Sequence, residues 1–208
     1  MPEPSTFAWI ATLPDRLLLA WPLMRLAGQR DPWRSTVHPV PLWMFGAGCQ
    51  EDFAWYLEGE GRVAVGDLKG LCRWLAGCDY TTDEALFRTE DFWQHPSTFE
   101  QIRKGDCDDH ALWAWRALGR LGLDAEFMVG QCRWPNGRTG QHAWVLFEKD
   151  GRQFLLEGTS GDPERMILPL EAAKPTYCPH FGVDHSLARK VYRGLLDGLD
   201  SAKPARGA

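Results

Sequence analysis

The chain has 208 residues, of which 44% are hydrophobic and 25% charged, and its formal net charge is −5. These values are typical of a globular protein with one sizeable core, and a negative charge without a basic stripe disfavours nucleic acid as a default partner. The most apolar stretch, residues 17–27 (LLLAWPLMRLA), is too short to cross a bilayer, so we expect no membrane partner.

The N-terminal third is predicted to be mainly helical. Amphipathic spacing predicts a helix over residues 14–29 and two more over residues 50–58 and 67–76. The last of these opens on Asp67, a residue type that is favoured at a helix N-cap. Residues 31–48 contain three prolines, and we expect an ordered loop or short turns there.

These elements suggest a division of the chain into three parts. Residues 1–85 are expected to form a helical extension that packs on a catalytic core, which we place at residues 86–199. The tail, residues 200–208 (DSAKPARGA), has no apolar periodicity and is expected to be frayed.

The middle of the chain contains one helix followed by three strands. Apolar residues at helical spacing predict a helix from Cys107 to Gly122, because glycine commonly follows a helix end. Short alternating or apolar runs then predict strands over residues 124–131, 141–149 and 152–158. Asp150-Gly151 separates the last two strands and is a strong signal for a two-residue hairpin turn, so we expect an antiparallel sheet.

The cysteines indicate a reducing compartment. They occur at irregular spacing and without a CxxC pair, at Cys49, Cys72, Cys78, Cys107, Cys132 and Cys178. The start of the chain lacks the basic region of a signal peptide, so reduced thiols in a cytoplasmic protein are expected. A structural zinc site formed by Cys132, Cys178 and His180 is an alternative, although these residues lack finger-like spacing.

Cys107 is the candidate nucleophile because of its position at a helix start. The free backbone N–H groups there favour a thiolate and could hold an oxyanion. The neighbouring carboxylates, Asp106, Asp108 and Asp109, oppose this effect by raising the pKa of a thiol, although acids in a first helical turn are partly neutralised by the same helix dipole. The alternative is an inert, buried cysteine.

The predicted hairpin supplies a partner for this cysteine. A two-residue turn places Trp144 opposite Glu157 and His142 opposite Thr159, so that His142 and Glu157 share one face as diagonal neighbours. A glutamate in this position could accept a hydrogen bond from the imidazole and fix its tautomer, which is the role of the third member of a Cys-His-acid triad. Asp162 is the alternative third member.

These motifs resemble those of a known superfamily. The stretch over residues 91–130 (DFWQHPSTFEQIRKGDCDDHALWAWRALGRLGLDAEFMVG) and the following residues 140–159 (GQHAWVLFEKDGRQFLLEGT) are similar to the transglutaminase-like superfamily. The likeness is greatest to the bacterial transglutaminase-like cysteine proteinases. The matching positions are Trp93, Pro96, Gly105, Asp106, Cys107, Asp108, Asp109, His142 and Glu157.

The resemblance implies a papain-like α+β fold, in which the nucleophile begins a central helix packed on an antiparallel sheet. It implies Cys107 as nucleophile, His142 as base and an acid as the orienting group, with Glu157 standing where the family usually has aspartate. No cofactor is required. Asp106 and Asp108 match positions at which acids bind calcium in the bacterial proteinases, so the resemblance makes a calcium site possible.

The function that follows is acyl transfer at an amide of a protein or peptide substrate, most simply hydrolysis. Besides the Cys107 N–H, the Trp93 indole or the Gln101 amide could complete an oxyanion hole. A protein cross-linking transglutaminase is one alternative. Another is a catalytically silent module that binds peptides through its tryptophans, with Trp113, Trp115, Trp134 and Trp144 as candidates.

Overall fold

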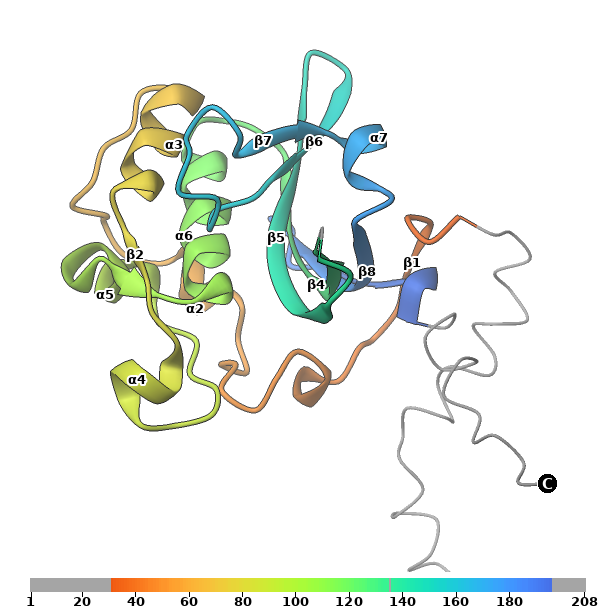
Figure 1. Ribbon diagram of the computed structural model, residues 1–208, viewed down its shortest axis with the longest axis horizontal. Coiled ribbons are helices and arrows are strands. Elements are labelled where there is room, and N and C mark those ends of the chain that lie inside the picture. Colours follow the sequence, from red (N-terminus) through yellow and green to blue (C-terminus); the bar gives the residue numbers. More distant parts are fainter. Residues whose placement is uncertain (1–30, 135, 196–208) are drawn as a thin grey trace, which may run out of the picture.

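The computed structural model describes residues 31–134 and 136–195. It has two layers, with most helices gathered on one side and the strands of a large sheet on the other (Figure 1). The predicted helix over residues 14–29 and the tail over residues 200–208 lie outside the described residues.

The sheet has seven strands in the order β1-β9-β8-β4-β5-β6-β7, and all neighbouring pairs are antiparallel. The strands are β1 (Ser35–Val37), β4 (Ala125–Arg133), β5 (Thr139–Lys149), β6 (Arg152–Leu156), β7 (Ile167–Pro169), β8 (Tyr177–Asp184) and β9 (Arg189–Tyr192). A separate parallel pair is formed by β2 (Asp79–Tyr80) and β3 (Lys104–Gly105). The α+β class with an antiparallel sheet, predicted from the sequence, is confirmed.

The central helix is α6 (Cys107–Arg120), which packs against β4 and β5. The other helices are η2 (Leu42–Met44), α2 (Ala54–Leu57), α3 (Leu68–Ala76), α4 (Asp83–Phe87), α5 (Pro96–Ile102) and α7 (Leu170–Ala173). Of these, α2, α3 and α5 contact α6 and cover the side of it that faces away from the sheet. The Asp67 side chain accepts a hydrogen bond from the Gly70 N–H and caps α3, as predicted.

The hairpin of β5 and β6 has the predicted register. Residues 150 and 151 form the turn with φ angles of 53° and 68°, a conformation that glycine and aspartate tolerate better than most residues. The pairs run from Lys149 with Arg152 to Val145 with Leu156. The ladder ends there, so the predicted pairs of Trp144 with Glu157 and of His142 with Thr159 are not formed.

Strand alternation divides the buried residues between the two faces of the sheet. Phe127 and Val145 belong to the large core under α6, and Met128 and Trp144 to a smaller core on the opposite face. The smaller core also contains Trp33, Leu155, Leu170 and Tyr177. The side chain of His142 lies on this second face, beside Trp144.

Four strands of the large sheet were not predicted. β1 lies within residues 31–48, where only loops and turns were expected, and β7, β8 and β9 follow the predicted hairpin. β8 contains Pro179 at a register irregularity opposite Gly130, so its local sequence does not give an alternating strand signal. The predicted helix over residues 50–58 is limited to α2. The division of the chain at residues 85 and 199 stays a prediction.

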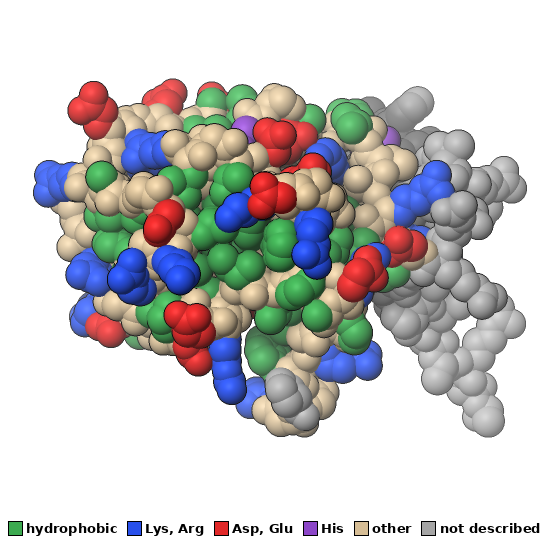
Figure 2. Space-filling model, turned by 90° about the horizontal axis from the view of Figure 1, so that it is seen from above, with side chains coloured by type: hydrophobic (Ala, Val, Ile, Leu, Met, Phe, Trp, Pro, Cys, Tyr) green, Lys and Arg blue, Asp and Glu red, His purple; other side chains and the backbone are tan. Residues whose placement is uncertain are grey.

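None of the helices in the two described ranges is long and apolar enough to cross a membrane. The face in Figure 2 shows hydrophobic side chains gathered in its centre and charged side chains of both signs interspersed around them.

Candidate active site

The GDCDD motif builds the start of α6. The Asp106 side chain accepts a hydrogen bond from the Asp108 N–H at 3.3 Å, and the Asp109 side chain accepts one from the Asp106 N–H at 3.3 Å. The bond from the Asp106 N–H to Asp109 is one half of a capping box, whose other half is the contact of the Asp109 N–H with the Asp106 side chain. A side chain at Gly105 would collide with Asp109, because an added Cβ would lie 2.1 Å from a carboxylate oxygen. The motif therefore fixes where the helix begins and places Cys107 in its first turn.

Asp109 is a structural anchor within this motif. It is fully buried, one of its oxygens accepts the Gln94 backbone N–H at 2.7 Å, and the other accepts the Gln94 side-chain amide. Burial raises the pKa of the Asp109 carboxyl to about 7, although the bonds from Gln94 oppose the rise. The contact with Gln94 ties α6 to the segment that precedes α5, and no sequence motif predicts it.

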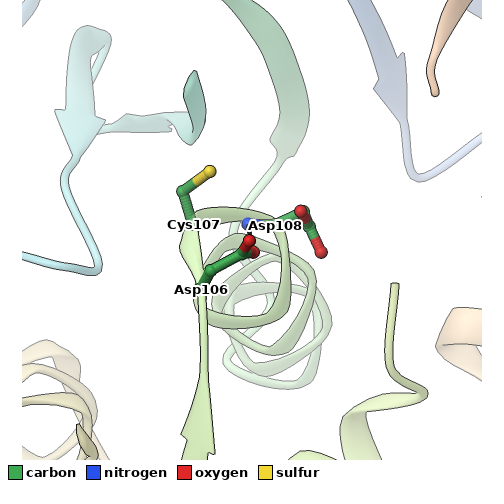
Figure 3. A group of neighbouring side chains, drawn as sticks. All are labelled: Asp106, Cys107 and Asp108. Atoms are coloured by element: carbon green, nitrogen blue, oxygen red, sulfur yellow. Dashed lines mark hydrogen bonds between the residues drawn. The ribbon is translucent and has the colours of Figure 1, made fainter. Parts of the chain in front are cut away.

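The Cys107 thiol and the flanking carboxylates point in different directions from the helix start (Figure 3). The thiol is half-buried, and burial raises its pKa, with further increases from the charges of Asp108 and Asp106. The Ala143 backbone N–H favours the thiolate and acts in the opposite sense. The sequence predicted that the helix start would lower the pKa of this thiol, whereas burial and the two acids raise it in the described structure.

His142 and Glu157 are in direct contact, as the strand register predicts. The distance from His142 Nε2 to Glu157 Oε2 is 2.7 Å, and their side chains are 8% and 12% exposed. Burial alone would raise the pKa of the Glu157 carboxyl, but hydrogen bonds from His142 and Thr159 outweigh burial and hold the pKa at about 2. Glu157 is therefore ionised and fixes one nitrogen of the imidazole.

Cys107 and His142 line the same cavity, which has a volume of about 630 Å³. The ladder between β5 and β6 ends at Val145 and Leu156, so no residue of β6 pairs with the part of β5 that holds His142 and Ala143. The start of α6 approaches this part of β5, since the Ala143 N–H interacts with the thiol. No hydrogen bond joins Cys107 to His142 in the described structure; such bonds are often long in ligand-free sites.

Five aspartates gather beside the thiol. Single oxygens of Asp83, Asp91 and Asp108 lie within 4.8 Å of one another, and the same is true of Asp83, Asp106 and Asp109. One buried oxygen of Asp83 and one of Asp108 have no hydrogen-bond partner among residues 31–134 and 136–195. Burial raises the pKa of Asp83 to about 6 and raises that of Asp108 as well. A set of hard, unsatisfied oxygens of this kind suits a divalent cation such as calcium.

The other predicted site residues are placed as follows. Trp93 is buried and lines the cavity, and its indole N–H donates to Asp91 at 2.9 Å. Gln101 is exposed, its amide donates to the Ser97 carbonyl at 3.1 Å, and it does not line the cavity. Asp162 is exposed and pairs with Arg165 at 3.5 Å, whereas the contact with His142 is made by Glu157.

Three of the tryptophans considered for a peptide groove are core residues. Trp113, Trp115 and Trp144 are at most 2% exposed, and only Trp134, at 39%, could contact a ligand from the surface. The zinc alternative finds no support either. Cys132, Cys178 and His180 do not form a cluster of ligand atoms among the residues that the structure describes.

No family model matches the chain, and no curated protein matches it by sequence. Among solved structures, LapG from Legionella pneumophila is similar at 18% identity and a TM-score of 0.47, with 64% of this chain and 71% of that chain covered. Its calcium-bound form gives 18% identity, a TM-score of 0.48 and coverage of 71% and 86%. A TGase gives 20% identity, a TM-score of 0.36 and coverage of 45% and 25%.

These likenesses concern the fold and are partial, since no identity among the three exceeds 20% and no TM-score exceeds 0.48. In the described residues, a helix that begins at Cys107 packs on a seven-stranded antiparallel sheet.

Proposed function

We propose that this chain is a cysteine peptidase or amidase in which Cys107 is the nucleophile, His142 the general base and Glu157 the group that orients His142. The proposal rests mainly on the contact between His142 Nε2 and Glu157 Oε2, which are 2.7 Å apart. The same imidazole lines the cavity that Cys107 also lines. A nucleophile, a base and a group that orients the base are the parts that covalent catalysis by a thiol requires.

The contact with Glu157 assigns the two imidazole nitrogens. Because Nε2 bonds to the ionised Glu157, Nδ1 is the nitrogen that remains for the thiol and the substrate. In the proposed reaction, Nδ1 accepts the thiol proton while sulfur attacks the carbonyl carbon. The tetrahedral intermediate collapses as the same proton passes to the leaving amine, and water then hydrolyses the thioester to release an acid and free thiol.

The oxyanion of the tetrahedral intermediate needs hydrogen-bond donors. The Cys107 backbone N–H belongs to the first turn of α6, where N–H groups have no partner within the helix. This donor is therefore our first candidate. Trp93 is the second, on condition that its indole leaves Asp91, and Gln101 would have to move into the cavity from an exposed position.

The aspartate cluster is proposed as a calcium site. Asp106 and Asp108 were predicted from the sequence, and the cluster adds Asp83 and Asp91. The unpartnered oxygens of Asp83 and Asp108 support this, because buried carboxylate oxygens are normally satisfied. A bound cation would supply positive charge beside the start of α6.

The second candidate function is a silent peptide-binding module that keeps this fold. The specific observation in its favour is that burial, Asp108 and Asp106 raise the pKa of the Cys107 thiol, which works against a reactive thiolate. The two functions differ in one measurable property, the reactivity of this cysteine compared with the other half-buried cysteines.

The test is labelling with iodoacetamide and with a library of electrophilic peptides at neutral pH, followed by peptide mapping. Catalysis predicts fast labelling of Cys107 that is lost in Cys107→Ala and slowed in His142→Ala. Cys78→Ala is the matched control, because Cys78 is also half-buried but lies outside the cavity and contacts the Trp74 carbonyl. Labelling of Cys107 no faster than that of Cys78, together with peptide binding that survives loss of Cys107 and His142, would favour the silent module.

A further inference from the structure

The carboxylate of Glu157 is held by more than the histidine. Its Oε2 accepts hydrogen bonds from His142 at 2.7 Å and from the Tyr177 hydroxyl at 2.8 Å. Its Oε1 accepts from the Thr159 N–H at 3.0 Å and the Thr159 hydroxyl at 2.6 Å. Thr159 follows Glu157 closely in the chain, whereas Tyr177 comes from β8, so Tyr177 is the donor that depends on the tertiary fold.

The bond from Tyr177 crosses the face of the sheet. β4 and β5 lie between β8 and β6 in the strand order, so the two side chains meet over the strands that separate them. The Tyr177 ring packs edge-on against Trp144 with centroids 5.2 Å apart, and its centroid lies 6.2 Å from that of His142. Tyr177 is 7% exposed and Trp144 is fully buried, so the hydrogen bonds around Oε2 are shielded from water.

Tyr177 can act on the site only through Glu157 and His142. His142 lines the cavity with Cys107, but neither Glu157 nor Tyr177 does. Burial and the charge of Glu157 raise the pKa of the Tyr177 hydroxyl, so it remains a donor over the working range of pH.

We propose that Tyr177 is a positioning residue for the reaction. Its hydroxyl and the His142 N–H both donate to Oε2 of Glu157. The bond from Tyr177 holds this oxygen beside Nε2 of His142. The imidazole proton therefore stays on Nε2, and Nδ1 is left to face the cavity. This inference rests on the proposed function. Outer residues that orient a ligand or base commonly change activity by about 10–100-fold when removed.

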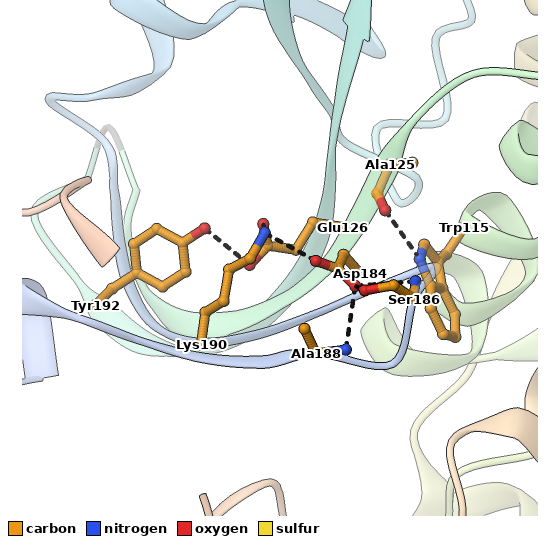
Figure 4. Close-up of polar contacts among 8 residues, drawn as sticks. All are labelled: Trp115, Ala125, Glu126, Asp184, Ser186, Ala188, Lys190 and Tyr192. Atoms are coloured by element: carbon orange, nitrogen blue, oxygen red, sulfur yellow. Dashed lines mark hydrogen bonds and ion pairs between the residues drawn. The ribbon is translucent and has the colours of Figure 1, made fainter. Parts of the chain in front are cut away.

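The structure offers a matched control on the same face of the sheet. Tyr192 is also buried, at 4% exposure, and its hydroxyl also donates to a buried glutamate, Glu126, at 2.8 Å. Figure 4 shows this second pair, in which Glu126 also bonds to Lys190. Tyr192 and Glu126 do not line the cavity that holds Cys107.

The experiment compares Tyr177→Phe with Tyr192→Phe in the full chain. Both variants lose one buried hydroxyl bond to a carboxylate, so both should lose thermal stability to a similar extent. We expect kcat to fall about tenfold in Tyr177→Phe with KM within twofold of the wild type, and to be unchanged in Tyr192→Phe. Equal effects of the two variants on kcat would overturn the proposal.

A second readout does not depend on turnover. In nitrogen-15 NMR of histidine-labelled protein, the wild type should show His142 protonated at Nε2, with slow exchange of that proton. Tyr177→Phe should mix the two tautomers or speed the exchange, and Tyr192→Phe should not. If the wild type lacks turnover that depends on Cys107, the proposed function fails, while an unchanged His142 signal in Tyr177→Phe would overturn the role of Tyr177 alone.

A third variant covers the case in which Tyr177→Phe does not fold. Fluorotyrosine incorporated at position 177 keeps the ring and the hydroxyl, makes the hydroxyl more acidic and adds one fluorine atom to the ring. We expect it to shift the His142 Nε2 proton resonance, whereas the same substitution at position 192 should leave it in place. No shift from position 177 would overturn the proposal.

Discussion

His142 and Glu157 lie 15 positions apart in the sequence, yet Nε2 of the imidazole and Oε2 of the carboxylate are 2.7 Å apart. The hairpin of β5 and β6 produces this contact, because its register places Glu157 just beyond the last pair of the ladder, on the face that carries His142. The longer side chain of glutamate spans the diagonal between the two strands. The contact brings a carboxylate to a histidine whose ring borders the thiol cavity.

Replacing Glu157 with glutamine should strongly reduce activity. The amide has nearly the same shape but no charge, so it cannot stabilise a protonated imidazole, and we expect kcat to fall by about 10²–10⁴-fold. Assays with a cleavable peptide found in the labelling screen would measure this. The control is Asp162→Asn, an exposed acid of the neighbouring loop, which should change nothing; comparable losses in both variants would count against Glu157 as the orienting acid.

The ionisation of Glu157 should also appear in the pH dependence of stability. Its pKa falls from the usual 4.5 to about 2 on folding, which corresponds to about 3 kcal/mol. A depressed carboxyl pKa stabilises the fold above about pH 4.5, and that contribution is lost as the pH falls toward 2. Urea unfolding of the wild type and Glu157→Gln between pH 2 and 7 should therefore converge at the acidic end. Parallel curves over the whole range would contradict the prediction.

Calcium should stabilise the folded protein if the aspartate cluster binds it. A ligand at 100 times its dissociation constant adds about 2.7 kcal/mol to the free energy of unfolding. We expect the melting temperature to rise in calcium, to fall in EGTA, and to respond less to magnesium, which prefers a smaller and more regular site. Asp108→Asn and Asp83→Asn should each weaken the response, and Asp162→Asn should keep it. A melting temperature that is the same in calcium and in EGTA would exclude the site.

Replacing Gly130 with alanine should destabilise the folded protein. It pairs with His142 across β4 and β5, and an added Cβ would lie 2.2 Å from the Cys178 carbonyl and 2.8 Å from the Trp144 ring. We expect Gly130→Ala to cost about 1–3 kcal/mol and to displace Trp144 and the neighbouring His142. Gly66→Ala is the control, because nothing lies within 4 Å of its added Cβ. Equal melting temperatures for the two variants would show that the strand yields without strain.

The contact between His142 and Glu157 and the start of α6 could be predicted because their determinants are local. A two-residue turn sets the register of a whole hairpin, and a capping aspartate with a glycine before it marks a helix start. Only part of the aspartate cluster could be predicted from the sequence. Asp106 and Asp108 lie in the GDCDD motif, whereas Asp83 and Asp91 come from a segment that precedes α5.

The contacts that were missed depend on long-range packing. Gln94 and Tyr177 each bond to a carboxylate of the site, Asp109 and Glu157 respectively, and no hairpin turn or helix cap in the sequence links either pair. The raised pKa of Cys107 was missed for a similar reason. The degree of burial of a thiol is decided by the elements that surround it, and the sequence shows only the charges beside it.

The pairing of β1 with β9 joins two segments separated by about three quarters of the chain. A shortened protein that began at residue 86 would keep every residue of the proposed triad, yet it would lose β1 as well as α2 and α3, which cover α6. β9 would become an open edge, ready to pair with a second molecule. A protein shortened to residues 86–208 is therefore expected to aggregate. A series of deletions would then suggest, wrongly, that residues 1–85 serve only to keep the protein in solution.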